Sequence, residues 1–152
     1  MRTKTIIAVL LTSMIVVGCR AVTGAVVDRR AVAQESLFSL AGTLIKDLFD
    51  NYQDFSMESF RAKVAVDFVS SRNDLVNNAA SNIRAAKVLD IDFSLDQVLS
   101  DKDLLMVDLK WQKRTRPYDS SNVVLTEGFT QAVFKNVAGQ WLLYQINKDN
   151  PF

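Results

Sequence analysis

The chain has 152 residues, which is enough for one domain with one hydrophobic core and too few for two ordinary domains. Its 18 basic and 17 acidic residues give a net charge of +1, so composition offers no electrostatic basis for binding nucleic acid. The chain has no histidine and one cysteine, which excludes histidine-based acid–base chemistry, the usual histidine metal sites and an intramolecular disulfide.

Residues 1–18 have the order of an export signal. Arg2 and Lys4 lie in a short basic start, and an uncharged apolar run follows over residues 6–17. That run is shorter than the roughly 20 apolar residues needed to cross a bilayer. We therefore expect residues 1–18 to be a signal peptide rather than a membrane span.

The end of this segment, Val16-Val17-Gly18-Cys19, resembles the bacterial lipobox. The resemblance implies cleavage before Cys19, diacylglycerol on its thiol and acylation of the new N-terminus. Acyl chains contribute about 0.8 kcal/mol per buried methylene, so two or three make a stable membrane anchor. Arg20 after the cysteine then implies sorting to the outer membrane, facing the periplasm. The alternative is an ordinary signal peptide in which Cys19 is incidental.

Helical patterns follow a tether at residues 19–33. From Gln34, apolar residues recur at spacings of three and four, which predicts an amphipathic helix in which Gly42 marks close packing. A second helix is predicted from an N-cap at Ser56, and a third from Asn73. The apolar positions of these helices are Leu37, Ala41, Leu44, Leu48, Tyr52, Met57, Phe60, Val64, Phe68, Leu75, Val76, Ala79 and Ile83.

After Lys87 the apolar period changes to two, which predicts strands. One strand carries Ile91, Phe93 and Leu95 on a single face. Three further extended segments follow, and Gly139 allows a hairpin between the last two. The expected fold is α+β, with N-terminal helices packed on a curved four-stranded antiparallel sheet. The three later segments are Leu104–Thr115, Val123–Phe134 and Gln140–Asn147.

The two faces of the predicted sheet differ in polarity. The first two strands have one polar face, which should meet water. The last two carry apolar side chains on both faces, so we expect a helix on one side and a partner on the other, with a homodimer through the sheet as one form of that contact. The apolar residues concerned are Phe129, Val133, Trp141 and Leu143.

The order of helices and strands resembles the NTF2-like, cystatin-like α+β folds. The closing stretch Gly139–Asp149, with its Gly-x-Trp start and apolar run, is similar to the end of many NTF2-like domains, and Asp108–Trp111 and Gly128–Phe134 fit the middle strands. The likeness covers residues 34–152. It implies a cone, the space enclosed between helices and sheet, but this fold hosts many roles.

Enzymes of this fold use aspartate, tyrosine or histidine inside the cone, where a carboxylate in a dry pocket becomes a useful base. Asp108 alternates with Val107 and Leu109, so its side chain is expected to face outward. No residue matches a catalytic position of the family, so we predict no catalytic residue, no metal, no cofactor and no enzyme. The alternative is an isomerase- or dehydratase-type enzyme with a cone carboxylate. The residues considered are Tyr52, Asp54, Asp67, Asp108, Tyr118 and Tyr144.

Six aromatic residues are candidates to line the cone as a pocket for a small apolar ligand, or to form ordinary core: Phe49, Tyr52, Phe60, Trp111, Phe134 and Tyr144. The loop at residues 114–122, with Lys110 and Lys113, is predicted to form a basic edge for an acidic partner or head group, or simply a solvated loop.

These features predict an exported, lipid-anchored, non-catalytic envelope protein that binds a partner protein or a small apolar ligand. A carrier of small ligands needs an open cone. A docking module can fill its cone and bind through another surface.

Overall fold

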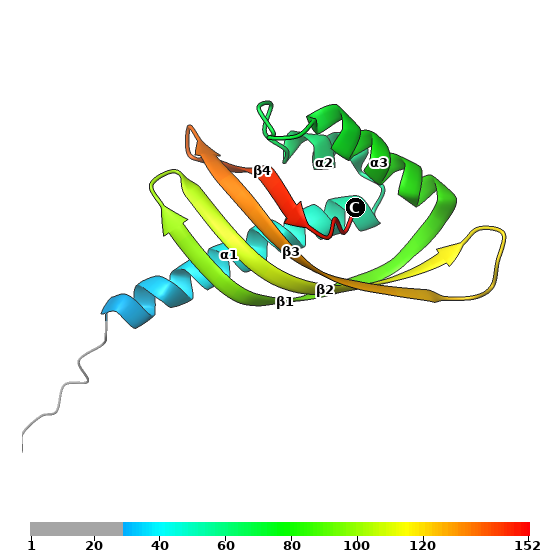
Figure 1. Ribbon diagram of the computed structural model, residues 1–152, viewed down its shortest axis with the longest axis horizontal. Coiled ribbons are helices and arrows are strands. Elements are labelled where there is room, and N and C mark those ends of the chain that lie inside the picture. Colours follow the sequence, from blue (N-terminus) through cyan, green and yellow to red (C-terminus); the bar gives the residue numbers. More distant parts are fainter. Residues whose placement is uncertain (1–28) are drawn as a thin grey trace, which may run out of the picture.

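The computed structural model describes residues 29–152, so the predicted signal peptide, Cys19 and most of the tether lie outside the described residues (Figure 1). Within the described residues, three helices precede one antiparallel sheet with the strand order β1-β2-β3-β4. The predicted α+β fold is confirmed. The elements are α1 (Arg29–Gln53), α2 (Met57–Ala62), α3 (Arg72–Ala85), β1 (Ala86–Asp101), β2 (Leu104–Pro117), β3 (Val124–Val137) and β4 (Gln140–Lys148).

Helix α1 begins at Arg29, five residues before the predicted start at Gln34, and lies along β1. Two glutamine side chains join the helix to this edge strand. The Gln34 Nε2 donates to the Val98 carbonyl at 3.2 Å, and the Gln53 Nε2 donates to the Leu89 carbonyl at 3.0 Å. The amides thereby pair carbonyls that an edge strand would otherwise leave to solvent.

Helix α2 is shorter than predicted. It ends at Ala62, whereas the apolar positions assigned to it continued to Val64 and Phe68, and Val64 lies in an extended segment. This segment runs beside β4. The Ala65 N–H donates to the Leu143 carbonyl, and the Leu143 N–H donates to the Lys63 carbonyl, both at 2.8 Å. The chain after α2 thus covers the open edge of β4.

Two local predictions on the helices are wrong. The N-cap of α3 is Ser71 rather than Asn73, since the Ser71 hydroxyl accepts from the Asp74 N–H at 3.2 Å. Gly42 does not mark a close approach, because a Cβ built there would lie 3.9 Å from the Leu95 Cδ1, an ordinary contact.

The sheet has an inner face toward the helices and an outer face toward solvent. Alternate residues of β2, from Leu105 to Trp111, are at most 4% exposed and pack into the core. Asp92 and Ser94 lie on the outer face of β1 and are exposed, which confirms the predicted polar face. Three bulges, two in the β1–β2 pairing and one in the β3–β4 pairing, interrupt the register and favour the curl of the sheet around α1 (Figure 1).

The last two strands also divide their apolar residues between the faces. Leu143 pairs with the buried Phe134 on the inner face, where Trp141 also packs against the core. Phe129 and Val133 alternate with the inward Thr130 and therefore lie on the outer face. The Lys148 ammonium covers the Phe129 ring, with its Nζ 3.9 Å from the centroid.

Candidate functional site

The cone is the candidate site, and five of the six predicted aromatic residues lie together in it. Phe49, Tyr52, Phe60, Trp111 and Phe134 are each at most 4% exposed and belong to one hydrophobic cluster. They come from α1, α2, β2 and β3, so the cone joins both layers of the domain. These side chains are part of the hydrophobic core and surround the centre of the cone.

Tyr144, the sixth residue, is not part of this cluster. It directly follows the inward Leu143 on β4 and therefore lies on the outer side, where the Lys135 Nζ is 5.1 Å from its ring centroid. The structure therefore separates Tyr144 from the other five candidates.

The centre of the cone is filled by the end of the chain itself. After β4 the chain turns in between α1 and the pair α2 and α3 (Figure 1). Pro151 is fully buried, and Phe152 is 5% exposed. The Phe152 ring meets three aromatic rings edge-on, at centroid distances of 4.8 Å to Phe60, 5.4 Å to Tyr52 and 5.6 Å to Phe49.

Lys113 is the cation of the cone. It follows Trp111 by two positions on β2, so its side chain lies on the inner face. Its Nζ donates to the Pro151 carbonyl at 2.6 Å and lies 5.3 Å from the Tyr52 ring centroid and 5.9 Å from the Trp111 ring centroid. Burial lowers the pKa of Lys113. Within residues 29–152 its ammonium has no carboxylate within ion-pair distance, so a carbonyl and two aromatic faces stabilise it.

Three further polar contacts hold the same tail. On α3, the Asn82 Nδ2 donates to the Phe152 carbonyl at 3.0 Å. The Thr130 hydroxyl donates to the Asp149 carbonyl and accepts from the Trp111 Nε1 at 2.8 Å. The Asp149 carboxylate accepts from the Phe129 N–H at 3.0 Å. The tail is therefore held by helix α3 and by both central strands.

Gly128 makes room for the indole that supports this contact. It pairs with Trp111 across β2 and β3, and a Cβ built there would lie 2.6 Å from the Trp111 Cζ2. Any side chain at this position would displace the ring from the Thr130 hydroxyl.

The aspartates considered as catalytic acids lie outside the cone. Asp54 is exposed beyond the end of α1, and Asp108 faces outward, where it accepts from the Gln131 Nε2 at 2.9 Å. Asp67 lies in the segment after α2 and pairs with the Lys135 Nζ at 2.6 Å, a contact that lowers the pKa of this carboxyl. None of these carboxylates is in the dry environment that a general base requires.

The two candidate tyrosines that remain differ in burial. Burial raises the pKa of Tyr52 to about 12, so its phenol is neutral at ordinary pH and can serve as a hydrogen-bond donor rather than a base. Tyr118 is 66% exposed at the β2–β3 loop. The cone thus contains a neutral phenol and an ammonium, without a matching acid–base pair among the described residues.

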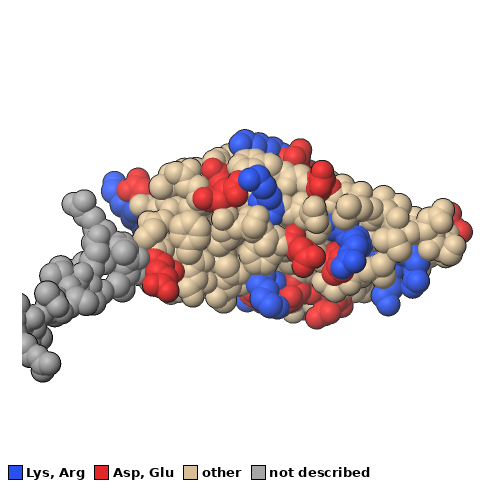
Figure 2. All heavy atoms as spheres, turned by 90° about the horizontal axis from the view of Figure 1, so that it is seen from below, with Lys and Arg blue, Asp and Glu red and all other residues tan. Residues whose placement is uncertain are grey.

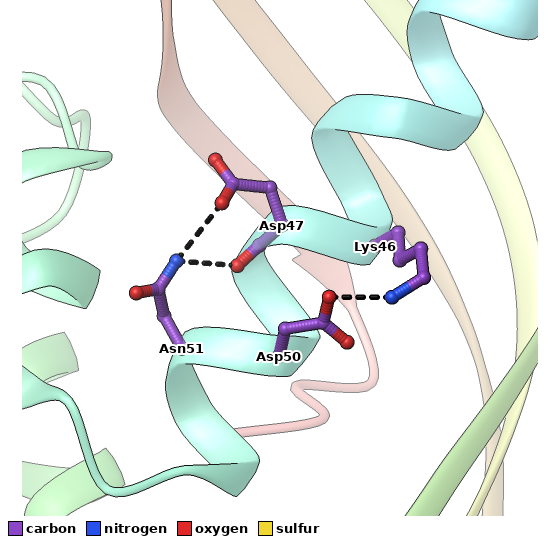
Figure 3. Close-up of polar contacts among 4 residues, drawn as sticks. All are labelled: Lys46, Asp47, Asp50 and Asn51. Atoms are coloured by element: carbon purple, nitrogen blue, oxygen red, sulfur yellow. Dashed lines mark hydrogen bonds and ion pairs between the residues drawn. The ribbon is translucent and has the colours of Figure 1, made fainter.

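Asp47 and Asp50, on the exposed side of α1, are paired within the chain (Figure 3). The Lys46 Nζ donates to the Asp50 carboxylate at 2.5 Å, and the Asn51 Nδ2 donates to the Asp47 carboxylate at 3.1 Å. Asp47 also pairs with the Lys63 Nζ at 2.6 Å. Such contacts between residues four apart stabilise a helix surface and need no ligand.

The predicted basic edge does not form. Arg114 pairs with Asp90, and the Lys110 Nζ lies 2.8 Å from the Asp96 carboxylate, while Lys113 points to the other face of the sheet. Figure 2 shows basic and acidic side chains interspersed over the visible face. Strand alternation divides the lysines of β2 between its two faces, which is why the edge is lost.

The sequence did not identify Phe152 as a residue of the cone, nor Asn82, Lys113 and Thr130 as the residues that bind the tail. Lys113 had a usable signal, because it continues the alternation from Leu105 to Trp111 and so belongs to the inner face. Phe152 had none, since its short tail carries no period.

No helix in the described part of the chain is long and apolar enough to cross a membrane. Within that part, no cluster of three or more acidic or cysteine side chains is placed to hold a metal ion.

Comparisons with known proteins support the fold alone. No model of a known protein family matches the sequence, and no curated protein matches it. Solved structures do match. A conserved protein from Planctomyces limnophilus superposes with a TM-score of 0.67 at 11% identity, over 76% of this chain and 94% of that chain. An NTF2-like superfamily protein from Salmonella enterica gives a TM-score of 0.62 at 9% identity, over 81% and 94%.

A ketosteroid isomerase-like protein from Erwinia carotovora gives a TM-score of 0.61 at 11% identity, over 76% of this chain and 96% of that chain. The predicted NTF2-like fold is thereby confirmed. At these identities the likeness carries the fold and not the activity.

Proposed function

We propose that this protein is a lipid-anchored, non-catalytic binding protein of the bacterial envelope, whose NTF2-like domain binds a protein partner. The observation that carries the proposal is the filled cone, in which Pro151 and Phe152 occupy the centre. A carrier of a small apolar ligand needs that volume, and a protein-docking module does not.

The anchor is supported by the sequence before the domain. Cys19 is the single cysteine and stands at the lipobox position, directly after Gly18. Residues 20–28 then separate the lipid from the start of α1 at Arg29. An anchor of this kind places the domain near the membrane. The proposed location is the outer membrane, with the domain facing the periplasm.

A catalytic role has weaker support. The Erwinia neighbour is described as ketosteroid isomerase-like, and an activity of that type needs a carboxylate in the cone. Asp54, Asp67 and Asp108 lie on the surface or the outer face, and Tyr52 is held neutral by its raised pKa. These positions favour binding over proton transfer.

A homodimer through the outer sheet face also has weaker support. That face pairs its charges within the chain, as in Arg114 with Asp90 and Lys110 with Asp96. Of its apolar residues, Val133 is 9% exposed and Phe129 lies under the Lys148 ammonium. Four further apolar residues of that face are 40–57% exposed and are the surface that a second copy would bury: Leu99, Leu104, Leu125 and Val137.

Fatty-acid labelling of the full chain in bacteria tests the proposed anchor. The wild type and Arg20→Ala are expected to incorporate label and to sediment with membranes, because both keep Cys19. Cys19→Ser is expected to incorporate none and to appear in the soluble fraction. Labelled Cys19→Ser, or unlabelled wild type, would contradict the anchor.

A further inference from the structure

We infer that the cone is a peptide-binding site, which residues Asp149–Phe152 occupy in cis and which accepts an extended proline–aromatic segment from a protein partner. This inference rests on the proposed binding function and names the chemistry of the partner. The tail occupies the cone in the same way that we propose for the partner segment.

Recognition of the aromatic ring is directional. Phe152 meets Phe49, Tyr52 and Phe60 at interplanar angles of 65°, 74° and 67°. Edge-to-face pairs place the positive ring edge against the negative ring face, a preference that an aliphatic side chain cannot reproduce. Three such contacts on one ring therefore select an aromatic residue at this position.

The residue before the ring suits proline. Pro151 is fully buried, and proline has no N–H that would be left without a hydrogen-bond partner there. Its carbonyl is the acceptor for the Lys113 ammonium. Another residue at this position would need a partner for its own N–H.

Three of the remaining contacts read the backbone, which any peptide carries. Lys113 and Asn82 donate to the carbonyls of two successive residues of the tail, Pro151 and Phe152. The Thr130 hydroxyl donates to the carbonyl of Asp149. These donors would engage a partner segment of the same shape equally well.

Lys113 gives a reason to regard the contact as a site rather than as core alone. An ammonium that is half-buried without a carboxylate partner is costly, and a methionine of similar length would fill the same space. Its present partner is a main-chain carbonyl, as a peptide-binding cation requires. Lys110, on the outer face of the same strand, has the ordinary surface pairing with Asp96.

The first part of the tail is exposed to solvent where it leaves the sheet. It leaves the sheet at Lys148, whose φ of 67° turns the chain away from β4, and Asp149 and Asn150 are exposed. A groove of about 390 Å³ adjoins this point, between the start of α3 and the end of β4. It is lined by Phe68, Ser70, Ser71, Asp74, Leu75, Asn78, Ile146, Lys148 and Asn150. A partner segment that replaces the tail can therefore extend into this groove, which Lys148 and Asn150 line.

The tethered tail competes at an effective concentration on the millimolar scale, as short flexible linkers do. If the tail occupies the site with a dissociation constant of about 0.1 mM or lower, removing it should strengthen binding of a free peptide by at least about tenfold. The test uses the full chain in detergent and a variant that ends at Lys148, the last residue of β4, so that all four tail residues are removed. The probe is a fluorescein-labelled peptide with the sequence of residues 147–152, Asn-Lys-Asp-Asn-Pro-Phe, and the readout is fluorescence anisotropy.

The shortened variant is expected to bind this peptide at least tenfold more tightly than the full chain. A peptide ending in alanine instead of phenylalanine should bind at least tenfold more weakly than the original. Lys113→Met in the shortened variant should lose most of the binding, whereas the matched Lys110→Met should not. Equal binding of the two peptides, or no binding by a folded shortened variant, would overturn the inference.

If the shortened variant is unfolded, the same peptide should restore a cooperative thermal transition, and failure to restore it would also overturn the inference. The two proposals fail separately. Loss of fatty-acid labelling with intact peptide binding removes the anchor and leaves the site. Absence of peptide binding with intact labelling leaves an anchored binding module whose partner docks elsewhere.

Discussion

Phe152 meets the ring of Phe60 edge-on, with the two centroids 4.8 Å apart and the ring planes at 67°. One ring comes from α2 and the other from the tail beyond β4. The helical layer and the end of the chain are therefore packed into one core, and the cone is complete only when the tail has folded back. The stability of the domain should depend on the tail accordingly.

Phe152→Ala is expected to lower the free energy of unfolding by about 3–5 kcal/mol, because it empties a site bounded by three aromatic rings. The matched control is Phe55→Ala, since Phe55 is 52% exposed and should change stability by about 0.5 kcal/mol or less. Urea denaturation measures both. Equal effects of the two substitutions would show that the tail does not stabilise the cone.

Gly128→Ala should destabilise the domain by about 1–3 kcal/mol, because the new methyl group would lie 2.6 Å from the Trp111 indole. Gly42→Ala is the matched control. Its methyl group meets only the Leu95 Cδ1 at 3.9 Å, and alanine favours the α1 helix by about 1 kcal/mol. Thermal melts should therefore move in opposite directions, and a shift of the same sign in both would contradict the packing described.

Thr130→Val should cost about 1–3 kcal/mol, since it leaves the Trp111 N–H and the Asp149 carbonyl without their shared partner. Thr126→Val, four residues earlier on β3, changes an exposed side chain and should be close to neutral. Denaturant midpoints of the two variants provide the comparison. A neutral Thr130→Val would mean that water replaces the hydroxyl.

Tyr52 should make stability fall at high pH. Its pKa is raised to about 12 in the folded protein, against 10.0 for a free tyrosine. The neutral phenol thus contributes stability that is complete below pH 10 and is lost as the pH rises through about 12. A shift of two units corresponds to about 3 kcal/mol.

Urea titrations of the wild type and Tyr52→Phe over this pH range isolate that contribution. Both proteins keep Lys113 and an aromatic ring beside its ammonium, so the difference between them reports the Tyr52 hydroxyl together with its coupling to Lys113. The wild type should lose stability more steeply than Tyr52→Phe. Parallel curves would mean that Tyr52 is hydrated in the folded state.

The regular elements could be predicted because their signals are local. The alternation from Leu105 to Trp111 fixed the inner face of β2, and the spacing of Ala41, Leu48 and Tyr52 fixed the inward side of α1. The cone aromatics of β2 and α1 followed from these two patterns. Tyr144 was wrongly included, because it directly follows the inward Leu143 and successive side chains of a strand point to opposite faces.

The tail could not be predicted for a different reason. Its position depends on the volume left between α1, α2 and the sheet, which is a property of the assembled domain. Pro151 and Phe152 are too few to carry a period, and their partners Asn82 and Lys113 are far away in the chain. The contents of the cone are therefore determined only by the packing of the assembled domain.

If Pro151 and Phe152 fill the cone, no small molecule can occupy it. Native mass spectrometry of the full chain, purified gently from bacterial membranes, tests this directly. We expect the mass of the acylated chain alone, unchanged when the protein is denatured, because the lipid on Cys19 is covalent. A discrete additional mass that denaturation releases would show that the cone holds a small ligand, and would contradict it.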